Sequence, residues 1–385
     1  MKIIAFYLPQ FHTFPENDKW WGKGFTEWTN TKKARKLFKE HYQPREPWND
    51  FYYNLLDKKT FEWQIKLAKE NGVDCFCIYH YWFGDGKKLM EKPLELFLEN
   101  KDLKQEFCIC WANENWTRNW DGKNKEIIMP QDYGDKKSWE KHFDYLLNFF
   151  KDERYIKEEG KPILVIYRPA LIPKLKEMLE YWNILAKKNN MPGICYMAQN
   201  AGTYYEMDFE NSMFDYGIMY EPGYTQALYN LKHGLLHSIK RIVENPKLFF
   251  HSNFQTIKVK VFSKLNLKKL NLMIYKLNYD MYWKDIIKRK NKKYILGAFV
   301  DWDNSARRGK KGARIFIGSN PQKFENYFTQ LIAKGIKLKQ KFIFITAWNE
   351  WAEGAYLEPD KKYNTQYLKA IKNSLERNGI FINER

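Results

Sequence analysis

The sequence predicts a single (β/α)8 barrel, an α/β fold, and three observations lead to this prediction. Eight short apolar runs rich in β-branched and aromatic residues recur along the 385 residues. Amphipathic stretches separate many of these runs, which is the pattern of βα units in a parallel sheet. No run leads into a G-x-G-x-x-G turn, so a doubly wound sheet, the main alternative, is less favoured. Eight such units predict a closed barrel.

Each element can be assigned in chain order. The predicted strands are Lys2–Pro9, Asp74–Trp82, Phe107–Ala112, Pro162–Arg168, Ile194–Gln199, Phe214–Tyr220, Ile295–Trp302 and Lys341–Trp348. The predicted helices are Thr60–Asn71, Ser138–Phe150, Pro173–Lys188, Pro321–Lys334 and Asn364–Arg377. Thr60 and Ser138 are the residue types that cap helix N-termini, so we expect them to cap the first two helices.

The segment after predicted strand six, about residues 223–293, is strongly basic. Between Lys232 and Lys293 it carries sixteen Lys and Arg residues against three acidic residues, most of the net charge of +19. Leu265–Leu277 has helical spacing, so we expect a largely helical insertion within one domain of residues 1–385. Such a segment could contact an anionic inner membrane face or a phosphate-bearing substrate. A lysine-rich solvated surface is the alternative.

Composition limits the class of protein. Hydrophobic residues make up 44% of the chain, and no apolar run approaches the roughly 20 residues that cross a bilayer. The first residues, MKIIAFYLPQFH, predict a strand and not a signal peptide. The five cysteines show no disulfide or C-x-x-C metal spacing and are expected to be buried thiols. We therefore expect a soluble, cytoplasmic protein with no nucleic-acid partner and no cofactor.

The ends of the predicted strands carry polar residues beside aromatic ones. In a barrel of this type the carboxyl ends of the strands form the active site. Aromatic faces stack on sugar rings while polar side chains bind sugar hydroxyls, so this mixture predicts a groove for an oligo- or polysaccharide. The predicted substrate-binding residues are Tyr7, Gln10, His12, Glu27, Trp28, His80, Asn113, Glu114, Trp116, Gln199, Asn200, Glu221, Asp303, Trp348, Asn349, Trp351 and Glu358.

Two acids at the end of predicted strand eight are the candidate catalytic residues. Breaking or forming a glycosidic bond commonly uses a pair of carboxyl groups, one to protonate the leaving oxygen and one to assist at the anomeric carbon. Glu350 and Glu353 are three residues apart, and a turn at Gly354 would bring both into one cleft. Because close carboxylates repel, one of them should keep its proton to higher pH.

Several longer motifs resemble known families. The sequence NEWAEG at 349–354, followed by Leu357-Glu358-Pro359, is similar to the catalytic motif of glycoside hydrolase family 99, retaining endo-mannosidases on a (β/α)8 barrel. Four motifs more closely resemble the WbsX-like family: AFYLPQFH at 5–12, WWGKGFTEW at 20–28, WANENWTRNW at 111–120 and DWDNSARR at 301–308. That family belongs to bacterial O-antigen and capsule loci and is described as glycosyltransferases. The resemblance implies an enzyme of bacterial surface-polysaccharide metabolism.

The family 99 resemblance also implies roles for the two acids. Glu350 would deprotonate the 2-hydroxyl of the sugar, which attacks its own anomeric carbon, while Glu353 would protonate the leaving group. Departures from the hydrolases in the N-terminal motifs and the basic segment leave the sugar open.

Three alternatives remain open. Asn113-Glu114 and Asn349-Glu350 are both Asn-Glu pairs, so Glu114 could be the acid/base and Glu350 a direct nucleophile. A transferase using a nucleotide sugar or lipid-linked sugar could hold a divalent metal with Asp301 and Asp303. The third alternative is a glycan-binding subunit without catalysis.

Overall fold

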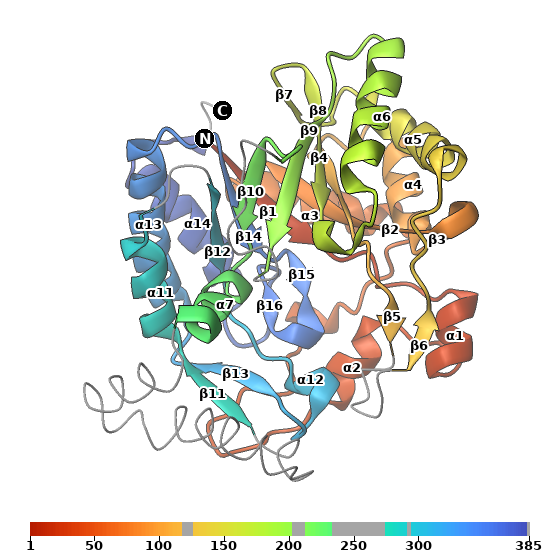
Figure 1. Ribbon diagram of the computed structural model, residues 1–385. Coiled ribbons are helices and arrows are strands. Elements are labelled where there is room, and N and C mark those ends of the chain that lie inside the picture. Colours follow the sequence, from red (N-terminus) through yellow and green to blue (C-terminus); the bar gives the residue numbers. More distant parts are fainter. Residues whose placement is uncertain (118–125, 202–211, 233–273, 291–293, 383–385) are drawn as a thin grey trace.

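The computed structural model describes residues 1–117, 126–201, 212–232, 274–290 and 294–382, and eight parallel strands form its centre (Figure 1). These strands are β1 (Lys2–Tyr7), β2 (Cys75–Phe83), β4 (Glu106–Trp111), β8 (Lys161–Ile166), β9 (Cys195–Asn200), β10 (Tyr216–Met219), β12 (Tyr294–Phe299) and β14 (Phe342–Thr346). Each pairs with the next, and β14 pairs with β1, so the sheet closes. The predicted (β/α)8 barrel is confirmed, and every predicted strand overlaps one of these eight.

Aromatic and thiol side chains fill the interior of the barrel. The ring of Phe6 on β1 lies 5.7 Å from Tyr79, 5.2 Å from Tyr220 and 5.4 Å from Phe344, measured between ring centres. The five cysteines are buried free thiols. Because the outer face of the strands is covered by helices as well, both faces of each strand are apolar, which explains the nearly continuous apolar runs in the sequence.

Gly297 allows β12 to approach β10 closely. A Cβ atom added at this glycine would lie 1.6 Å from the backbone oxygen of Met219, far inside van der Waals contact. No side-chain movement can relieve a contact with backbone. The barrel therefore needs glycine at this position.

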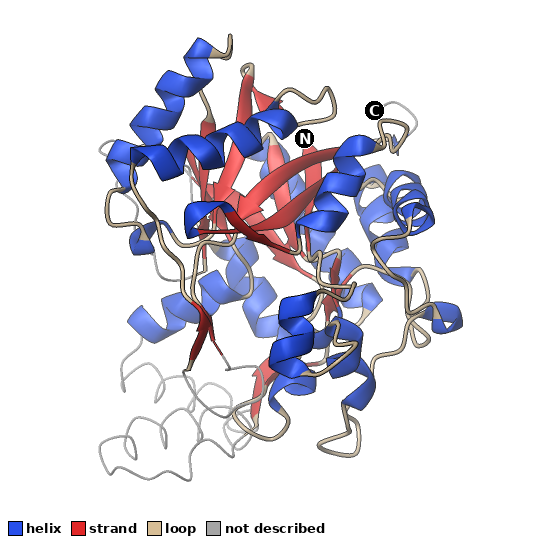
Figure 2. Cartoon of the chain, turned by 90° about the vertical axis from the view of Figure 1, so that its right-hand side faces the viewer, coloured by secondary structure: helices blue, strands red, loops and turns tan. Residues whose placement is uncertain are grey.

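Helices surround the strands, which lie at the centre of the view in Figure 2. The described helices are α1 (Pro15–Trp21), α2 (Glu27–Lys33), α3 (Lys58–Glu70), α4 (Glu91–Glu99), α5 (Lys136–Phe150), α6 (Leu175–Lys188), α7 (Gly223–Lys232), α11 (Tyr279–Lys288), α12 (Ser305–Arg308), α13 (Pro321–Lys337) and α14 (Gln366–Glu376). The five predicted helices correspond to α3, α5, α6, α13 and α14.

The predicted caps of α3 and α5 are wrong by a few residues. The side chain of Asp57 accepts a hydrogen bond from the backbone N–H of Lys59, and Asp135 accepts two, from Lys137 and Ser138. Each helix therefore begins earlier than predicted. An aspartate is as good an N-cap as serine or threonine, and its negative charge also favours the positive end of the helix dipole.

Short strands lie around the end of the barrel where the eight strands finish. They include β5 (Trp116–Thr117) paired with β6 (Ile127–Met129), β11 (Tyr275–Asn278) with β13 (Arg314–Ile317), and β15 (Asn349–Glu350) with β16 (Ala355–Tyr356). Figure 1 shows all three pairs below the barrel. Two further strands, β3 (Lys87–Leu89) and β7 (Lys157–Glu158), extend β2 and β8 antiparallel.

The basic segment is only partly helical within the described residues. Its ends form α7 and α11, but residues 275–277 belong to strand β11, so the helical prediction for Leu265–Leu277 is wrong there, and residues 265–273 lie outside the described part. Pairing with β13 provides hydrogen bonds that local helical spacing does not predict. Among the described residues, no helix is both long and apolar enough to cross a bilayer.

Candidate active site

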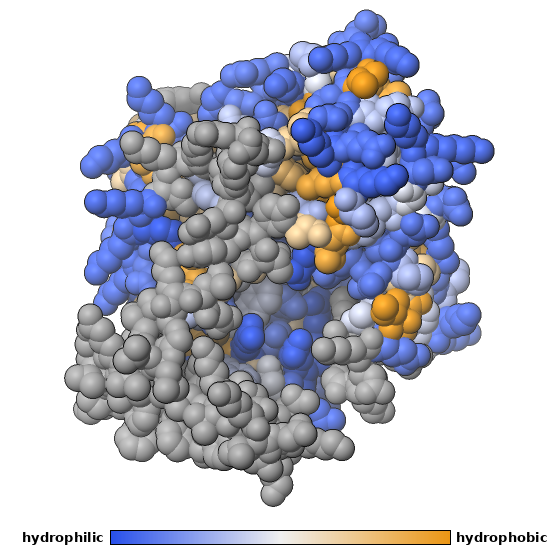
Figure 3. Space-filling model, viewed as in Figure 1, coloured by the Kyte–Doolittle hydropathy of each residue, from blue (hydrophilic) through white to orange (hydrophobic). Residues whose placement is uncertain are grey.

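A cavity of about 520 Å³ opens at the carboxyl end of the barrel. Figure 3 shows a hollow on this side of the molecule, with many hydrophilic residues around it. The cavity is lined by side chains at the ends of seven of the eight strands: Leu8, Tyr79, Tyr81, Ala112, Glu114, Asn115, Trp116, Thr117, Tyr167, Arg168, Tyr220, Trp302, Asn304, Arg307, Arg308, Glu350 and Glu353. We call it the mouth cavity. It lies where enzymes of this fold place their catalytic residues.

A tight turn brings Glu350 and Glu353 into the mouth cavity together. Glu350 ends β15, the residues Trp351–Glu353 form one turn of 3-10 helix, and Gly354 follows with φ of +64°. Such a positive φ favours glycine. The backbone N–H of Asp303 donates a hydrogen bond to the backbone carbonyl oxygen of Glu353 at 2.6 Å. This bond fixes the turn against the end of β12. The predicted turn at Gly354 is therefore present.

Arg307 on α12 is the partner of both glutamates. Its Nη1 atom lies 2.5 Å from Oε1 of Glu353, and its Nη2 atom lies 3.8 Å from Oε2 of Glu350. The same guanidinium binds Glu27, a fully buried residue of α2. One cation thus contacts three carboxyl groups. Of the two that line the cavity, Glu353 is the closer to Arg307.

Because Arg307 lies closer to Glu353 than to Glu350, it affects the pKa values of the two glutamates differently. Burial, and then the negative charge of Glu353, raise the pKa of Glu350 to about 8, while Arg307 opposes the shift. Burial also raises the pKa of Glu353, but the nearby guanidinium of Arg307 counteracts it. Since the stronger contact is to Glu353, Arg307 favours the negative charge on Glu353 and the proton on Glu350.

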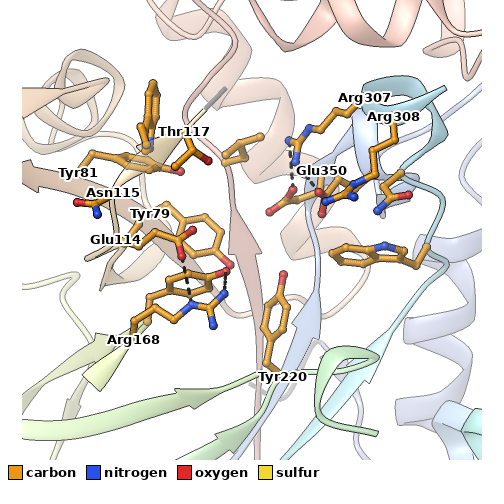
Figure 4. A pocket seen from close by; sticks show the side chains of 17 residues that line it. Tyr79, Tyr81, Glu114, Asn115, Thr117, Arg168, Tyr220, Arg307, Arg308 and Glu350 are labelled. Atoms are coloured by element: carbon orange, nitrogen blue, oxygen red, sulfur yellow. Dashed lines mark hydrogen bonds and ion pairs between the residues drawn. The ribbon is translucent and has the colours of Figure 1, made fainter. Parts of the chain in front are cut away.

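A third carboxyl group of the mouth cavity, that of Glu114, lies on the opposite wall. Glu114 follows β4, and its Oε2 atom is 3.2 Å from Nε of Arg168, which follows β8. Burial raises the pKa of Glu114, and Arg168 opposes this shift. Figure 4 shows this pair facing Glu350 and Arg307 across the cavity, with the phenol rings of Tyr79 and Tyr220 between them. The two acid and arginine groups therefore flank one space.

The asparagine that precedes each of these glutamates holds the backbone of a neighbouring strand. Asn349 accepts a hydrogen bond from the N–H of Leu8 at 2.7 Å and donates to its oxygen at 3.0 Å. Asn113 does the same with Arg168, at 2.8 Å for both bonds. The sequence predicted that both asparagines bind sugar hydroxyls, but their side-chain amides are engaged by these backbone groups instead. They fix the strand ends from which Glu350 and Glu114 project.

Replacing Asn349 with alanine is expected to lower the free energy of unfolding by about 2–4 kcal/mol, because the buried backbone groups of Leu8 lose both partners. Urea denaturation would measure the change. Asn326→Ala, at an exposed position of α13, is the matched control and should change stability by less than about 0.5 kcal/mol. Equal stability of the two variants would contradict the role of Asn349.

Glu358 anchors the two tryptophans of the NEWAEG motif region outside the mouth cavity. Its carboxylate accepts hydrogen bonds from the indoles of Trp348 at 3.0 Å and Trp351 at 2.6 Å, and from Tyr53 and Gln64. Tyr7 is buried beside them and donates to Gln64. The prediction that Tyr7, Trp348, Trp351 and Glu358 bind substrate is wrong for this cavity, because all four are buried away from it in one hydrogen-bond network that runs through Glu358 and Gln64.

The D-x-D carboxylates are also occupied by protein groups. Asp303 is fully buried and accepts hydrogen bonds from His41 and Gln43, both at 2.8 Å, and Asp301 pairs with Arg45 at 2.7 Å. Neither aspartate lines the mouth cavity. They hold the segment 41–45 against the end of β12, which is a structural position and not the expected substrate or metal contact.

Other predicted residues lie beneath or outside the mouth cavity. His80 is on the outer face of β2, where its Nε2 atom lies 3.0 Å from His142, and burial lowers its pKa to about 3. Glu221 pairs with Arg289 at 2.7 Å. Gln199 contacts Cys110 inside the barrel. The remaining residues without a place in the mouth cavity are Gln10 and Asn200, which are buried, Glu27, which lies behind Arg307, and His12 and Trp28, which line a second cavity.

Of the predicted residues, the structure brings Glu114, Trp116, Glu350 and Glu353 together. The sequence interpretation did not connect the other residues that line the mouth cavity with the two glutamates, above all Arg307, Arg168 and the tyrosines. Two signals were present. Tyr79 and Tyr81 share one face of β2 by their spacing of two, and Tyr167 and Arg168 directly follow β8, whose end contributed no candidate.

A (β/α)8 barrel with paired glutamates among aromatic side chains at its mouth is the arrangement of carbohydrate-active enzymes. A model of the family described as Glycosyltransferase WbsX matches residues 3–371, and the chain belongs to this family. The resemblance seen in the four sequence motifs is thereby confirmed.

The chain is also similar to two curated proteins and, in fold, to solved structures. Two proteins of Xanthomonas campestris pv. campestris, both called Uncharacterized protein WxcX, are 31% identical over 382 residues, 97% of this chain and 50% of theirs. The chain therefore spans about half the length of these relatives. The family 99 endo-α-mannosidase of Bacteroides thetaiotaomicron, in complex with Bis-Tris propane, has a TM-score of 0.56 at 13% identity, over 97% of this chain and 96% of that one. A structure called Glycoside hydrolase-like protein has a TM-score of 0.51 at 14% identity, over 97% of this chain and 93% of that one. These structural likenesses concern the fold.

Proposed function

We propose that this protein makes or breaks glycosidic bonds with retention of configuration, and that Glu350 and Glu353 carry the proton transfers. The observation behind the proposal is that one arginine contacts both glutamates of one cavity, closely at Glu353 and distantly at Glu350. This supports one neutral and one ionised carboxyl group at neutral pH, the state that acid and base catalysis requires. The aromatic walls suit the apolar faces of sugar rings.

The steps follow from this charge state and from the resemblance to family 99. The ionised glutamate takes the proton of the 2-hydroxyl, O2 bonds to the anomeric carbon, and the neutral glutamate gives its proton to the leaving oxygen. An acceptor hydroxyl then attacks the same carbon and gives its proton to the glutamate that protonated the leaving oxygen. The bond from the anomeric carbon to O2 breaks, and O2 takes its proton back from the other glutamate. Water as acceptor gives hydrolysis, and a sugar hydroxyl gives transfer.

The roles of the two glutamates in this proposal are the reverse of those that the resemblance implies, in which Glu350 is the base and Glu353 the acid. The close contact of Arg307 with Glu353 favours the anion on Glu353, which supports Glu353 as the base and Glu350 as the acid. Because the acid must be protonated, activity on a poor leaving group should fall as the pH rises through about 8, the pKa of Glu350.

Glu350→Gln and Glu353→Gln are each expected to lower the rate by about 10²–10⁴. The assay is mass spectrometry of products from a panel of bacterial surface oligosaccharides. Glycosyl fluorides, whose leaving group needs no proton, should restore the rate of Glu350→Gln and not that of Glu353→Gln. If glycosyl fluorides restored the rate of Glu353→Gln alone, Glu353 would be the acid and Glu350 the base, as the resemblance implies.

The matched control is Glu180→Gln on the outer surface of α6, which should leave the rate unchanged. Wild-type product formation by both cavity variants would overturn the proposal. Chain extension from a sugar nucleotide and Mn²⁺, indifferent to the two glutamates, would instead support the nucleotide-sugar transferase, and glycan binding without turnover would support a binding subunit.

A second candidate mechanism is favoured by the position of Glu114 across the cavity from Glu350. In that mechanism Glu350 attacks the anomeric carbon and Glu114 is the acid and base. A 2-deoxy-2-fluoro glycosyl donor would then leave a sugar covalently bound to Glu350. Peptide mass mapping detects this adduct, which the mechanism through the 2-hydroxyl does not form.

Metabolic context is part of the same proposal. The resemblance to proteins of O-antigen and capsule loci supports a lipid-linked or free polysaccharide as substrate, handled in the cytoplasm at the inner membrane face. Within the basic segment, Lys284, Lys288 and Lys290 are exposed on or beside α11 and suit contact with anionic lipid. Arg289 does not take part, because it binds Glu221 and Thr225.

A further inference from the structure

A second cavity, of about 540 Å³, lies beside α2 and shares no lining residue with the mouth cavity. We call it the α2 cavity. Three segments line it, with the residues Phe11, His12, Thr13, Gly24, Thr26, Trp28, Thr29, Lys32, Lys33, Tyr52, Tyr53 and Asn54. It therefore contains the aromatic and polar residues, His12 and Trp28, that the sequence assigned to a sugar groove.

His12 gives this cavity a buried hydrogen-bond acceptor. Its side chain is 2% exposed, and its Nδ1 atom lies 3.0 Å from the carbonyl oxygen of Pro9. A carbonyl only accepts, so Nδ1 must carry the proton. Burial lowers the pKa of His12 to about 4, which keeps the ring neutral. Nε2 is then a bare acceptor, and it has no hydrogen-bond partner among the described residues.

The other walls of the α2 cavity offer aromatic and cationic groups. Trp28 and Tyr52 contact each other edge to face, at 5.1 Å between ring centres. The ammonium of Lys32 lies 3.9 Å from the centre of the Tyr52 ring, and Lys33 is exposed one residue further along α2. An apolar wall, a buried acceptor and two ammonium groups at the rim therefore surround one space.

We propose that the α2 cavity binds a single sugar unit that carries an anionic group. A sugar hydroxyl donates to Nε2 of His12, the ring face packs on the aromatic wall, and the anion pairs with Lys33 and Lys32. A carboxylate of a uronic acid and a phosphate ester are the two sources of such an anion. The site is separate from the chemistry of the mouth cavity, because α2 stands between them and directs Glu27 to Arg307.

Saturation-transfer NMR on the full chain tests this proposal with three probes: glucuronate, glucose 1-phosphate and glucose. We expect wild type to bind at least one anionic probe more tightly than glucose, and the preferred probe identifies the anion. Lys33→Glu should weaken that probe by about tenfold or more, the loss expected when a charge-assisted hydrogen bond is removed. His12→Leu should weaken all probes, because it removes the acceptor.

Glu353→Gln distinguishes the two cavities, since it alters only the mouth. The proposal stands if this variant binds the anionic probe as wild type does. It is overturned if no probe binds wild type, if glucose binds as tightly as both anions, or if Lys33→Glu leaves affinity unchanged. If Glu353→Gln no longer bound the anionic probe, the proposal would also be overturned, because the probe would then bind in the mouth cavity. Lys33 is exposed, so its variant should fold even if His12→Leu does not.

Discussion

Replacing Arg307 with leucine is expected to lower the free energy of unfolding by about 3–5 kcal/mol at pH 8, because buried carboxylates lose their shared cation. The deficit should depend on pH. Without the guanidinium, Glu350 and Glu353 titrate in the folded protein above their unfolded pKa values, so stability falls as the pH rises through the folded values. At pH 4, where both groups approach neutrality in both states, the deficit should shrink. Denaturation in urea at pH 4, 6 and 8 measures it.

Arg308→Leu is the matched control for this experiment. Arg308 is the next residue of α12 and also lines the mouth cavity, but its side chain is exposed. Its removal should change stability by less than about 0.5 kcal/mol at each pH. If Arg307→Leu is as stable as Arg308→Leu at pH 8, the three carboxyl groups do not depend on Arg307 for charge balance.

Gly297→Ala is expected to be the most damaging small substitution in the barrel. The added methyl group would lie 1.6 Å from the oxygen of Met219, so β10 and β12 must separate. Overpacking against backbone should cost about 3 kcal/mol or more and lower the melting temperature by about 4 °C or more. Circular dichroism on heating provides the measurement, and the yield of folded protein is a second readout.

Gly223→Ala tests whether any glycine near β10 would give this result. A Cβ atom at Gly223 would meet its nearest neighbours at 3.6 Å, ordinary contact, and we expect little change in its melting temperature. Similar melting of both variants and wild type would mean that β12 can move away from β10 without loss.

The eight strands could be predicted because both of their faces are buried. Runs such as 75–83 and 342–346 are apolar except for His80 and Thr346, and such nearly continuous runs are typical of strands buried on both faces. The prediction of secondary structure failed where a local sequence pattern conflicted with a contact that forms only in the folded protein. Residues 275–277 have helical spacing, yet they pair with β13, and only the folded arrangement brings that partner close.

The candidate site could be predicted only in part, for a physical reason. Polar residues at strand ends serve two purposes that look alike in the sequence: some face the cavity, and others fasten the backbone that supports it. Glu350 and Glu358 are both glutamates after β14, but one lines the cavity and the other accepts four hydrogen bonds. Arg307 was missed because its partners come from α2 and from the turn after β15, which are far apart in sequence.

The hydrogen bonds between Asn349 and Leu8 join residues that are 341 positions apart. The last strand must therefore be synthesised and docked against the first before Glu350 reaches its place. A growing chain that has made seven strands has no assembled pair of glutamates, however well those strands are formed. Under the proposed mechanism, the catalytic site is therefore complete only after the barrel has closed.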